Sequence, residues 1–199
     1  MSAISPGIAS LFWSTVGAEC LVTALALISI VLPDRRVWPP PQPGAWGQFT
    51  MSFLFFVSGI GAILLGILDW GAFRFAPWLR AGVGLPLWLA GDSLALWAIV
   101  TLGLTSTTGE RGTLVRHGPY RFSRNPQYVG FIGSLAGWAL MTNSLLAVIA
   151  ALAGIVPLLL APFAEEPWLL AQYGADYETY KRSVPRFMGF PKSNISPKP

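Results

Sequence analysis

The longest uncharged stretch in this sequence covers residues 125–164, which are 40 positions without Asp, Glu, Lys or Arg. One helix crosses the hydrocarbon core of a bilayer with about 20 residues, so this stretch is twice as long as a single crossing needs. Its main polar interruption, Met141-Thr142-Asn143-Ser144, is typical of a tight turn. The stretch therefore predicts two transmembrane helices, residues 126–141 and 145–163, joined as a hairpin.

Three further stretches are long enough to cross a membrane. Residues 9–32 carry one charge, Glu19, residues 49–68 carry none, and residues 81–104 carry only Asp92. Acids inside membrane spans are functional candidates by default. Charged residues make up 11% of the chain, against about 25% in water-soluble domains, so most of the surface cannot face water. The sequence thus predicts an all-α, polytopic membrane protein with about five transmembrane helices.

The basic residues are distributed unequally between the two sides of such a topology. Eleven of the 13 lie in segments 33–48, 105–124 and 165–199, whereas the opposite side holds only Arg74 and Arg80. Basic residues prefer the cytoplasmic side, so we expect an external N-terminus and a cytoplasmic C-terminus, in a bacterial inner membrane. The net charge of +4 follows from this asymmetry, so membrane lipids are expected partners and nucleic acids are not.

The two halves of the chain differ in polar chemistry. Residues 1–104 are typical of a transmembrane scaffold, with a Pro-rich connector at residues 37–43 that cannot be helical. Residues 105–190 contain almost all of the unusual polar residues and are predicted to form the catalytic, cofactor-binding region. Residues 191–199 are polar and contain prolines, which predicts a flexible tail. The whole chain is expected to be one integral-membrane domain.

A polar loop, residues 112–125, separates the third predicted span from the hairpin and contains the only histidine, His117. Asn125 is predicted to cap the next helix, with Pro126 in its first turn, where a missing amide donor costs nothing. The amide groups that follow could bind a carboxylate at the positive end of that helix. The alternative is that the arginines of the loop only anchor the membrane surface and that its tyrosines belong to an interfacial belt.

Two adjacent carboxylates, Glu165 and Glu166, stand at the last membrane exit, on a side that is otherwise basic. Carboxylates at a membrane interface suit a cationic ligand, and the alternative is a plain salt bridge to Arg121 or Arg124. A helix that continues past Pro167 would place one apolar and aromatic face over the polar loop. That face would consist of Glu166, Leu170, Tyr173, Tyr177, Tyr180 and Val184.

Two segments carry a family resemblance. The segment HGPYRFSRNPQYVG at residues 117–130, followed after the hairpin by EEPWLLAQYGADYETYKRSVPRF at residues 165–187, resembles the superfamily of isoprenylcysteine carboxyl methyltransferases and phospholipid N-methyltransferases. The resemblance implies an S-adenosylmethionine-dependent methyltransferase, with a cofactor pocket at the cytoplasmic face under a C-terminal helix and a lipophilic acceptor that enters from the bilayer. The cofactor-binding residues that it implies are Thr113, Leu114, Val115, His117, Gly118, Tyr120, Asn125, Pro126, Gln127, Tyr128, Glu165 and Glu166.

Two departures from the family pattern bear on the substrate. The family commonly has His-Pro where this chain has Asn125-Pro126, and the isoprenylcysteine enzymes carry an arginine one turn before the first Glu, where this chain has Ala161. A prenylcysteine carboxylate would therefore lack its partner, so a phospholipid amine is the favoured acceptor. An amine must lose a proton before it accepts a methyl group, and the candidate catalytic bases are Glu165, Glu166 and His117.

Two other classes of function fit parts of the sequence. Membrane sterol and ene reductases share a related C-terminal architecture and use NADPH, although they typically lack the glutamate pair. A non-catalytic membrane assembly or transport subunit is the second alternative. No metal site is expected, and the sequence does not predict the oligomeric state.

Overall fold

The computed structural model describes residues 4–41, 46–103, 107 and 112–190, so the predicted tail, residues 191–199, lies outside the described residues. All regular secondary structure in these residues is helical, which confirms the all-α prediction. The longer helices are α1 (Pro6–Val31), α2 (Trp46–Leu68), α4 (Leu85–Leu102), α6 (Pro126–Thr142), α7 (Leu145–Tyr173) and α8 (Ala175–Ser183). The shorter elements are η1 (Pro33–Arg35), α3 (Pro77–Leu79), η2 (Arg80–Gly84) and η3 (Gly118–Arg121).

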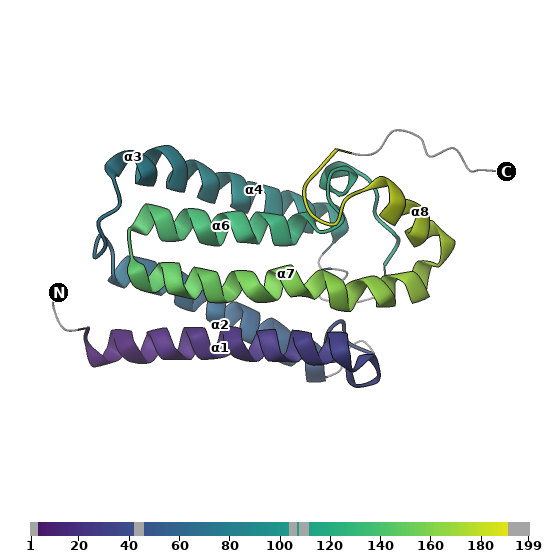
Figure 1. Ribbon diagram of the computed structural model, residues 1–199, viewed down its shortest axis with the longest axis horizontal. Coiled ribbons are helices and arrows are strands. Elements are labelled where there is room, and N and C mark those ends of the chain that lie inside the picture. Colours follow the sequence, from purple (N-terminus) through teal and green to yellow (C-terminus); the bar gives the residue numbers. More distant parts are fainter. Residues whose placement is uncertain (1–3, 42–45, 104–106, 108–111, 191–199) are drawn as a thin grey trace.

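The five longest helices, α1, α2, α4, α6 and α7, form a bundle. Each of them runs antiparallel to the next one along the chain (Figure 1). α4, α6, α7 and α1 lie side by side in that order, and α2 packs against α1, α7 and α6. The α2–α3 connector and the α6–α7 turn lie together at one end, called here the far end. The connector after α1, the polar loop and α8 lie at the opposite end, called the pocket end.

Among the described residues, four helical segments are long and apolar enough to cross a membrane: α1, α2, α7 and the continuous stretch Pro77–Leu102 that α3, η2 and α4 form together. α6 contains 17 residues, so it is about 25 Å long, against a hydrocarbon core of about 30 Å. The prediction of about five spans is thus confirmed for four. α6 differs from them in length, although it packs inside the bundle between α4 and α7.

The turn between α6 and α7 lies where the sequence predicted it. Asn143 ends α6 with a φ of 57°, in the left-handed region that Asn tolerates better than most residues. Ser144 caps α7, because its Oγ accepts a hydrogen bond from the Ala147 amide at 3.0 Å. The predicted hairpin is confirmed, and its second helix is longer than expected.

Polar contacts hold the far end together. The Ser144 hydroxyl donates to Asp69 Oδ2 at 2.5 Å, and Asn143 Oδ1 accepts a hydrogen bond from the Phe75 amide at 2.8 Å. Arg80 Nε donates to a carbonyl near the end of α6 at 3.2 Å. These contacts join the α2–α3 connector and the start of α4 to the α6–α7 turn, so they fix the hairpin relative to its neighbours.

Glycines bring η2 and α4 into backbone contact with α6. A Cβ atom added to Gly130 would lie 2.6 Å from the Ala95 amide nitrogen, and one added to Gly84 would lie 2.7 Å from that of Met141. Gly91 faces the α6 backbone in the same way. Small residues of this kind let membrane helices approach closely, and a larger side chain would push them apart. The contact sets the first turn of α6 beside the last turn of α4 at the pocket end.

α7 and α8 are two helices, not the single helix that the predicted stripe required. α7 continues past Pro167, which the predicted stripe required, but it ends at Tyr173. Gly174 follows with a φ of 53° and a ψ of −129°, a conformation that favours glycine, and it turns the chain into α8. Part of the predicted face survives the turn, because Tyr177, Tyr180 and Val184 form a buried cluster against Leu114, Leu169 and Tyr173.

The two acids inside predicted spans have different surroundings. Glu19 is buried, and a Cβ atom on Gly154 of α7 would lie 2.8 Å from its Oε1. Asp92 is exposed on α4 and accepts a hydrogen bond of 2.5 Å from the Ser134 hydroxyl of α6. Neither lines the cavity at the pocket end, so the structure gives them no part in that site.

Candidate active site

A cavity of about 120 Å³ lies at the pocket end. A single water molecule needs about 10–15 Å³ on the same measure, so this space suits part of a small-molecule ligand. Its walls come from the connector after α1, the end of α4, the polar loop, the first turn of α6, the end of α7 and α8. The lining residues are Trp38, Pro39, Leu102, Thr107, Thr113, Leu114, Val115, Tyr120, Arg124, Asn125, Gln127, Tyr128, Glu165, Trp168, Leu169, Tyr173, Tyr177 and Tyr180.

Glu165 on α7 is the one carboxylate among the described lining residues. Its Oε1 accepts two hydrogen bonds, from Trp38 Nε1 at 2.6 Å and from the Tyr128 hydroxyl. Its Oε2 has no donor among the described residues, and it is not sealed inside the protein. Hydrogen bonds to an ionised group are the strong ones, so the two donors hold the carboxylate in one orientation. One oxygen is therefore fixed by the protein, and the other remains open to the cavity.

Aromatic side chains form much of the cavity wall. Burial raises the pKa of Tyr177 to about 12, and it raises the pKa values of Tyr120 and Tyr180 above their usual range. These phenols stay neutral at physiological pH, so Glu165 carries the negative charge of the described lining. Aromatic faces attract cations, and a carboxylate adds direct charge attraction. The wall thus suits a ligand group with a positive charge.

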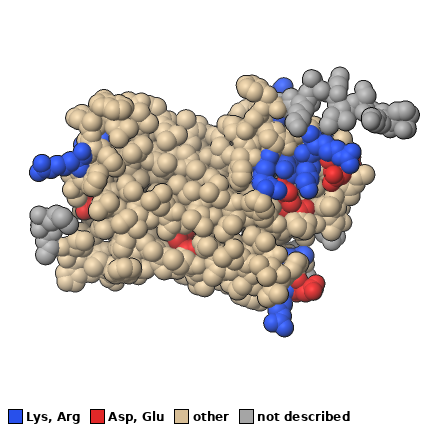
Figure 2. All heavy atoms as spheres, viewed as in Figure 1, with Lys and Arg blue, Asp and Glu red and all other residues tan. Residues whose placement is uncertain are grey.

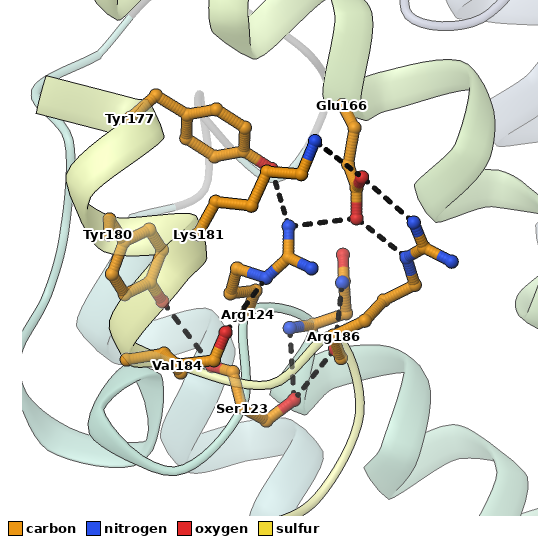
Figure 3. A network of polar contacts seen from close by, with 9 residues as sticks. Ser123, Arg124, Glu166, Tyr177, Tyr180, Lys181, Val184 and Arg186 are labelled. Atoms are coloured by element: carbon orange, nitrogen blue, oxygen red, sulfur yellow. Dashed lines mark hydrogen bonds and ion pairs between the residues drawn. The ribbon is translucent and has the colours of Figure 1, made fainter. Parts of the chain in front are cut away.

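Arg124 is the one basic residue in the described lining, and its side chain is only 7% exposed. Its Nε donates to the Val184 carbonyl at 3.1 Å, and its Nη1 donates to the Tyr177 hydroxyl at 3.3 Å (Figure 3). The same Nη1 lies 2.8 Å from Glu166 Oε1. Arg124 therefore joins the polar loop to α7, to α8 and to the segment after α8.

Glu166, next to Glu165 in the chain, lies in a different environment. Arg186 binds its carboxylate with Nε at 2.6 Å and Nη2 at 2.9 Å, while Arg124 and Lys181 lie 2.8 Å and 3.8 Å away (Figure 3). The hydrogen bonds to Glu166 raise the pKa of Arg186 above its usual value. Glu166 is buried and does not line the cavity. It holds the polar loop and the C-terminal segment against α7.

The segment after α8, residues 184–189, runs along the polar loop and fixes its backbone. The Arg124 amide donates to the Pro185 carbonyl at 2.9 Å. Asn125 occupies the N-cap position of α6, as predicted, but its side chain makes no capping hydrogen bond. Its Nδ2 instead donates to the Arg186 carbonyl at 2.9 Å. The backbone that leads into α6 is therefore set by the C-terminal segment.

Basic side chains gather at the pocket end of the molecular surface (Figure 2). In this view they surround α8 and the polar loop and are interrupted by a few acidic side chains. The far end carries Arg74 and Arg80. The charge asymmetry therefore runs along the bundle axis. In a membrane protein, basic residues are unequally distributed between the two ends of such a bundle because they prefer one side of the bilayer.

The family model for phospholipid methyltransferases matches residues 79–176, which include the polar loop, the α6–α7 hairpin and both glutamates. Protein-S-isoprenylcysteine O-methyltransferases of Rattus norvegicus and Mus musculus are each 28% identical to the chain over 188 residues, 88% of this chain and 61% of theirs. Over the region that contains the cavity, the chain is thus similar to integral-membrane methyltransferases of this family. The methyltransferases of the family use S-adenosylmethionine.

A reductase also shares sequence with this chain. A steroid 5-alpha-reductase of Solanum lycopersicum is 34% identical over 115 residues, which are 56% of this chain and 43% of the reductase. The chain thus spans 43% to 61% of the length of these curated relatives. No solved structure matches it significantly.

The cavity brings together most of the cofactor-binding residues that the family resemblance implied. His117, Gly118, Pro126 and Glu166 do not line it. His117 is exposed at the start of η3, so of the three candidate bases only Glu165 reaches the cavity. The predicted residues that line it are Thr113, Leu114, Val115, Tyr120, Asn125, Gln127, Tyr128 and Glu165.

Sequence reasoning missed the part of the site that comes from the scaffold half of the chain. Trp38 lies 127 positions before the carboxylate to which it donates, so no local spacing connects them. The Pro-rich connector folds back because the Val37 and Trp38 amides donate to the Ser29 hydroxyl, at 3.0 Å and 3.1 Å. An aromatic residue inside a Pro-rich connector was the only available signal. Leu102 at the end of α4 also lines the cavity, and no local spacing in the sequence connects it to the other lining residues.

Proposed function

We propose that the chain is an S-adenosylmethionine-dependent methyltransferase that acts on a lipophilic amine, with a phospholipid amine as the favoured acceptor. The observation that carries the proposal is Glu165, a carboxylate held by Trp38 and Tyr128 with one oxygen open to an aromatic cavity. The site lies at one end of a bundle of membrane helices, where a water-soluble cofactor and a lipid headgroup can meet.

The residues of the cavity fit the charge of the cofactor. S-adenosylmethionine carries an ammonium and a sulfonium, and cations of this kind are favoured by aromatic faces and by a carboxylate. Glu165 supplies the carboxylate, and Tyr120, Tyr177 and Trp168 belong to the surrounding wall. In this proposal Thr113, Leu114 and Val115 form the opposite strip, where the apolar parts of the ligand pack.

When bound, the cofactor supplies a methyl group that its sulfonium already activates, so the protein does not need to activate this group. Methyl transfer would break the carbon–sulfur bond of the bound cofactor, form a bond from that carbon to the acceptor nitrogen and release a thioether. The cavity walls hold both partners in line and exclude water. A protonated amine must first release a proton, and Glu165 Oε2 is the acceptor for it in this proposal, because Glu166 is bound by cations and His117 lies outside the cavity.

The acceptor is inferred from what the cavity lacks. Arg124 is the one cation of the described lining. The position one turn before Glu165 is Ala161, so no second arginine is available there for a prenylcysteine carboxylate. An acceptor with a neutral or cationic reacting group therefore fits better than an anionic one.

We further propose that α6 is a fifth membrane span and that the pocket end faces the cytoplasm of a bacterial inner membrane. The basic surface at that end supports this orientation (Figure 2). The sole cysteine, Cys20, can be replaced by serine to give a background for labelling. A cysteine introduced at Glu178 of α8 should then react with an impermeant thiol reagent only after the membrane is opened.

Methyl transfer is tested with the protein reconstituted in lipid nanodiscs and S-adenosylmethionine labelled on the methyl group. Phosphatidylethanolamine is offered as acceptor in one sample and an S-prenylated cysteine in a second. We expect label on the lipid amine and none on the prenylcysteine carboxylate. Label on the carboxylate alone would overturn the acceptor assignment, and label in neither product across a panel of lipophilic amines would overturn the methyltransferase proposal.

A membrane reductase is the second candidate, supported by the similarity to the Solanum lycopersicum steroid 5-alpha-reductase. NADPH carries several phosphate charges, and phosphates are normally bound by clustered basic side chains. The described lining offers one arginine and one carboxylate, which suits a zwitterion better than a polyanion. NADPH binding by the purified protein, without S-adenosylmethionine binding, would favour the reductase.

A further inference from the structure

The guanidinium of Arg124 has donors that the protein does not use. Its Nε is bonded to the Val184 carbonyl, and its Nη1 is bonded to the Tyr177 hydroxyl and to Glu166. No described residue accepts a hydrogen bond from Nη2, which carries two further N–H groups (Figure 3). The side chain is 7% exposed, and the residue lines the cavity. The protein therefore binds Nε and Nη1 of this buried arginine and leaves Nη2 without an acceptor among the described residues.

The charges around Arg124 do not balance. Arg124, Arg186 and Lys181 surround the single carboxylate of Glu166, so three positive charges meet one negative charge. Lys181 and Arg186 are 40% and 30% exposed and are partly solvated, whereas Arg124 is not. Buried charges need partners, since water does not compensate them. Arg124 is thus the buried, cavity-lining member of a cluster whose net charge is positive.

We propose that Arg124 is an anion-binding residue whose Nη2 edge binds a carboxylate or phosphate group of the ligand in the cavity. Arginine binds such groups through a rigid fork of donors. With Glu165 as the negative pole of the same cavity, the site then presents one negative and one positive group, the complement of an amino-acid zwitterion. The proposal rests on the proposed function, because the carboxylate of S-adenosylmethionine is its first expected occupant.

Glu166 acts in this proposal through Arg124, as a positioning residue. Arg124 Nη1 is bound to Glu166, and Arg186 and Lys181 engage the same carboxylate, so Glu166 cannot rotate toward the cavity without losing three cations. The adjacent glutamates thus have separate tasks. Glu165 faces the cationic part of the ligand, and Glu166 holds the arginine that faces the anionic part.

The test compares the binding of two cofactors by calorimetry: S-adenosylmethionine and its decarboxylated analogue, which lacks only the carboxylate. We expect the wild-type protein to bind S-adenosylmethionine about 10- to 100-fold more tightly than the analogue. Arg124→Lys keeps a positive charge for Glu166 but loses the fork of donors. In this variant the affinities for S-adenosylmethionine and for the analogue should differ by less than about threefold, and the affinity for the analogue should stay at its wild-type value. Arg186→Lys is the matched control, since it touches Glu166 but not the cavity, and it should keep the wild-type ratio.

The outcomes separate the two proposals. If neither cofactor binds the folded wild-type protein, the proposed function fails. If both bind and Arg124→Lys weakens both equally, leaving the ratio unchanged, Arg124 is structural and the anion-binding proposal is overturned. If the wild-type ratio is already one, the same variants are tested for KM toward phosphatidylethanolamine. A KM raised about tenfold by Arg124→Lys, and unchanged by Arg186→Lys, assigns the anion to the phosphate of the acceptor, whereas an unchanged KM overturns the proposal.

Discussion

The far end and the pocket end of the bundle use the same kinds of side chain with different results. At the far end, Asp69 accepts from the Ser144 hydroxyl and Arg80 donates to the α6 backbone, so both side chains join one connection to another. At the pocket end, Glu165 and Arg124 also make such contacts, but both line a cavity and each keeps polar atoms without a partner among the described residues. A carboxylate and an arginine at a helix end therefore indicate a binding site only where bonding capacity is left facing a cavity.

The adjacent residues Glu165 and Glu166 show the same contrast between a side chain available to a ligand and a structural one. Glu166 is engaged at both oxygens by three cations and stabilises the fold. Glu165 is engaged at one oxygen by neutral donors and keeps its charge for a ligand. Substitutions at the two positions should therefore separate stability from binding.

A large effect is expected at the seam between α4 and α6, on which the pocket end depends. In Gly130→Ala the new Cβ would lie 2.6 Å from the Ala95 amide nitrogen, so the helices must move apart, at a cost of about 3 kcal/mol. Thermal unfolding in detergent measures this cost. Gly133→Ala is the control, since its nearest neighbour lies 3.5 Å away, which is ordinary contact. Equal stability of the two variants would contradict the close packing of the seam.

Glu166→Gln should destabilise the protein by about 3–5 kcal/mol, because it leaves Arg124 buried without its carboxylate. The matched control is Glu178→Gln, which removes a carboxylate from an exposed pair with Arg182 at 3.5 Å and should cost less than about 1 kcal/mol. Chemical denaturation of both variants in the same detergent compares them. Similar losses in the two would mean that the Glu166 cluster is not a structural centre.

At the far end, Asn143→Ala should cost about 1–2 kcal/mol, because it removes the acceptor for the Phe75 amide and places alanine at a φ of 57°. S-adenosylmethionine affinity should stay unchanged. Asn143→Gly separates the two causes, since glycine tolerates the backbone conformation but lacks the acceptor. A clear loss of cofactor affinity in a folded Asn143→Ala protein would break the distinction between the ends.

The smallest effect is expected from Trp38→Phe, which keeps an aromatic wall but removes one donor to Glu165. Cofactor affinity should fall about three- to tenfold, and stability should change little. Trp70→Phe at the far end serves as the control and should leave affinity unchanged. Calorimetry on both variants measures the difference, and an equal change in both would argue against a role for Trp38 in the site.

The membrane-spanning part of the fold was predictable because it depends on local composition. Long apolar runs and a polar interruption at Asn143 predicted the hairpin and the end of α6. The second helix of the hairpin was predicted to end at residue 163, before the glutamate pair and Pro167, yet α7 continues to Tyr173. The break at Gly174 needs a positive φ, which glycine permits but does not require.

The candidate site was predictable only where its residues share one motif. Asn125, Gln127 and Tyr128 are close in sequence to the polar loop, and Glu165 follows a recognisable hairpin. The separation of Glu165 from Glu166 depends on which way each side chain leaves α7, and Trp38 reaches the site through a folded connector. These features are tertiary, so neither composition nor spacing could provide them.

The most direct test of the contrast between the two ends is calorimetry of S-adenosylmethionine binding to the wild type, Glu165→Gln and Asp69→Asn. The same chemical change is made at the pocket end and at the far end. We predict that Glu165→Gln weakens binding about 100-fold or more and that Asp69→Asn leaves the affinity within about twofold of wild type, with both variants folded. Equal affinity in all three proteins, or equal loss in the two variants, would contradict the assignment of Glu165 to the ligand.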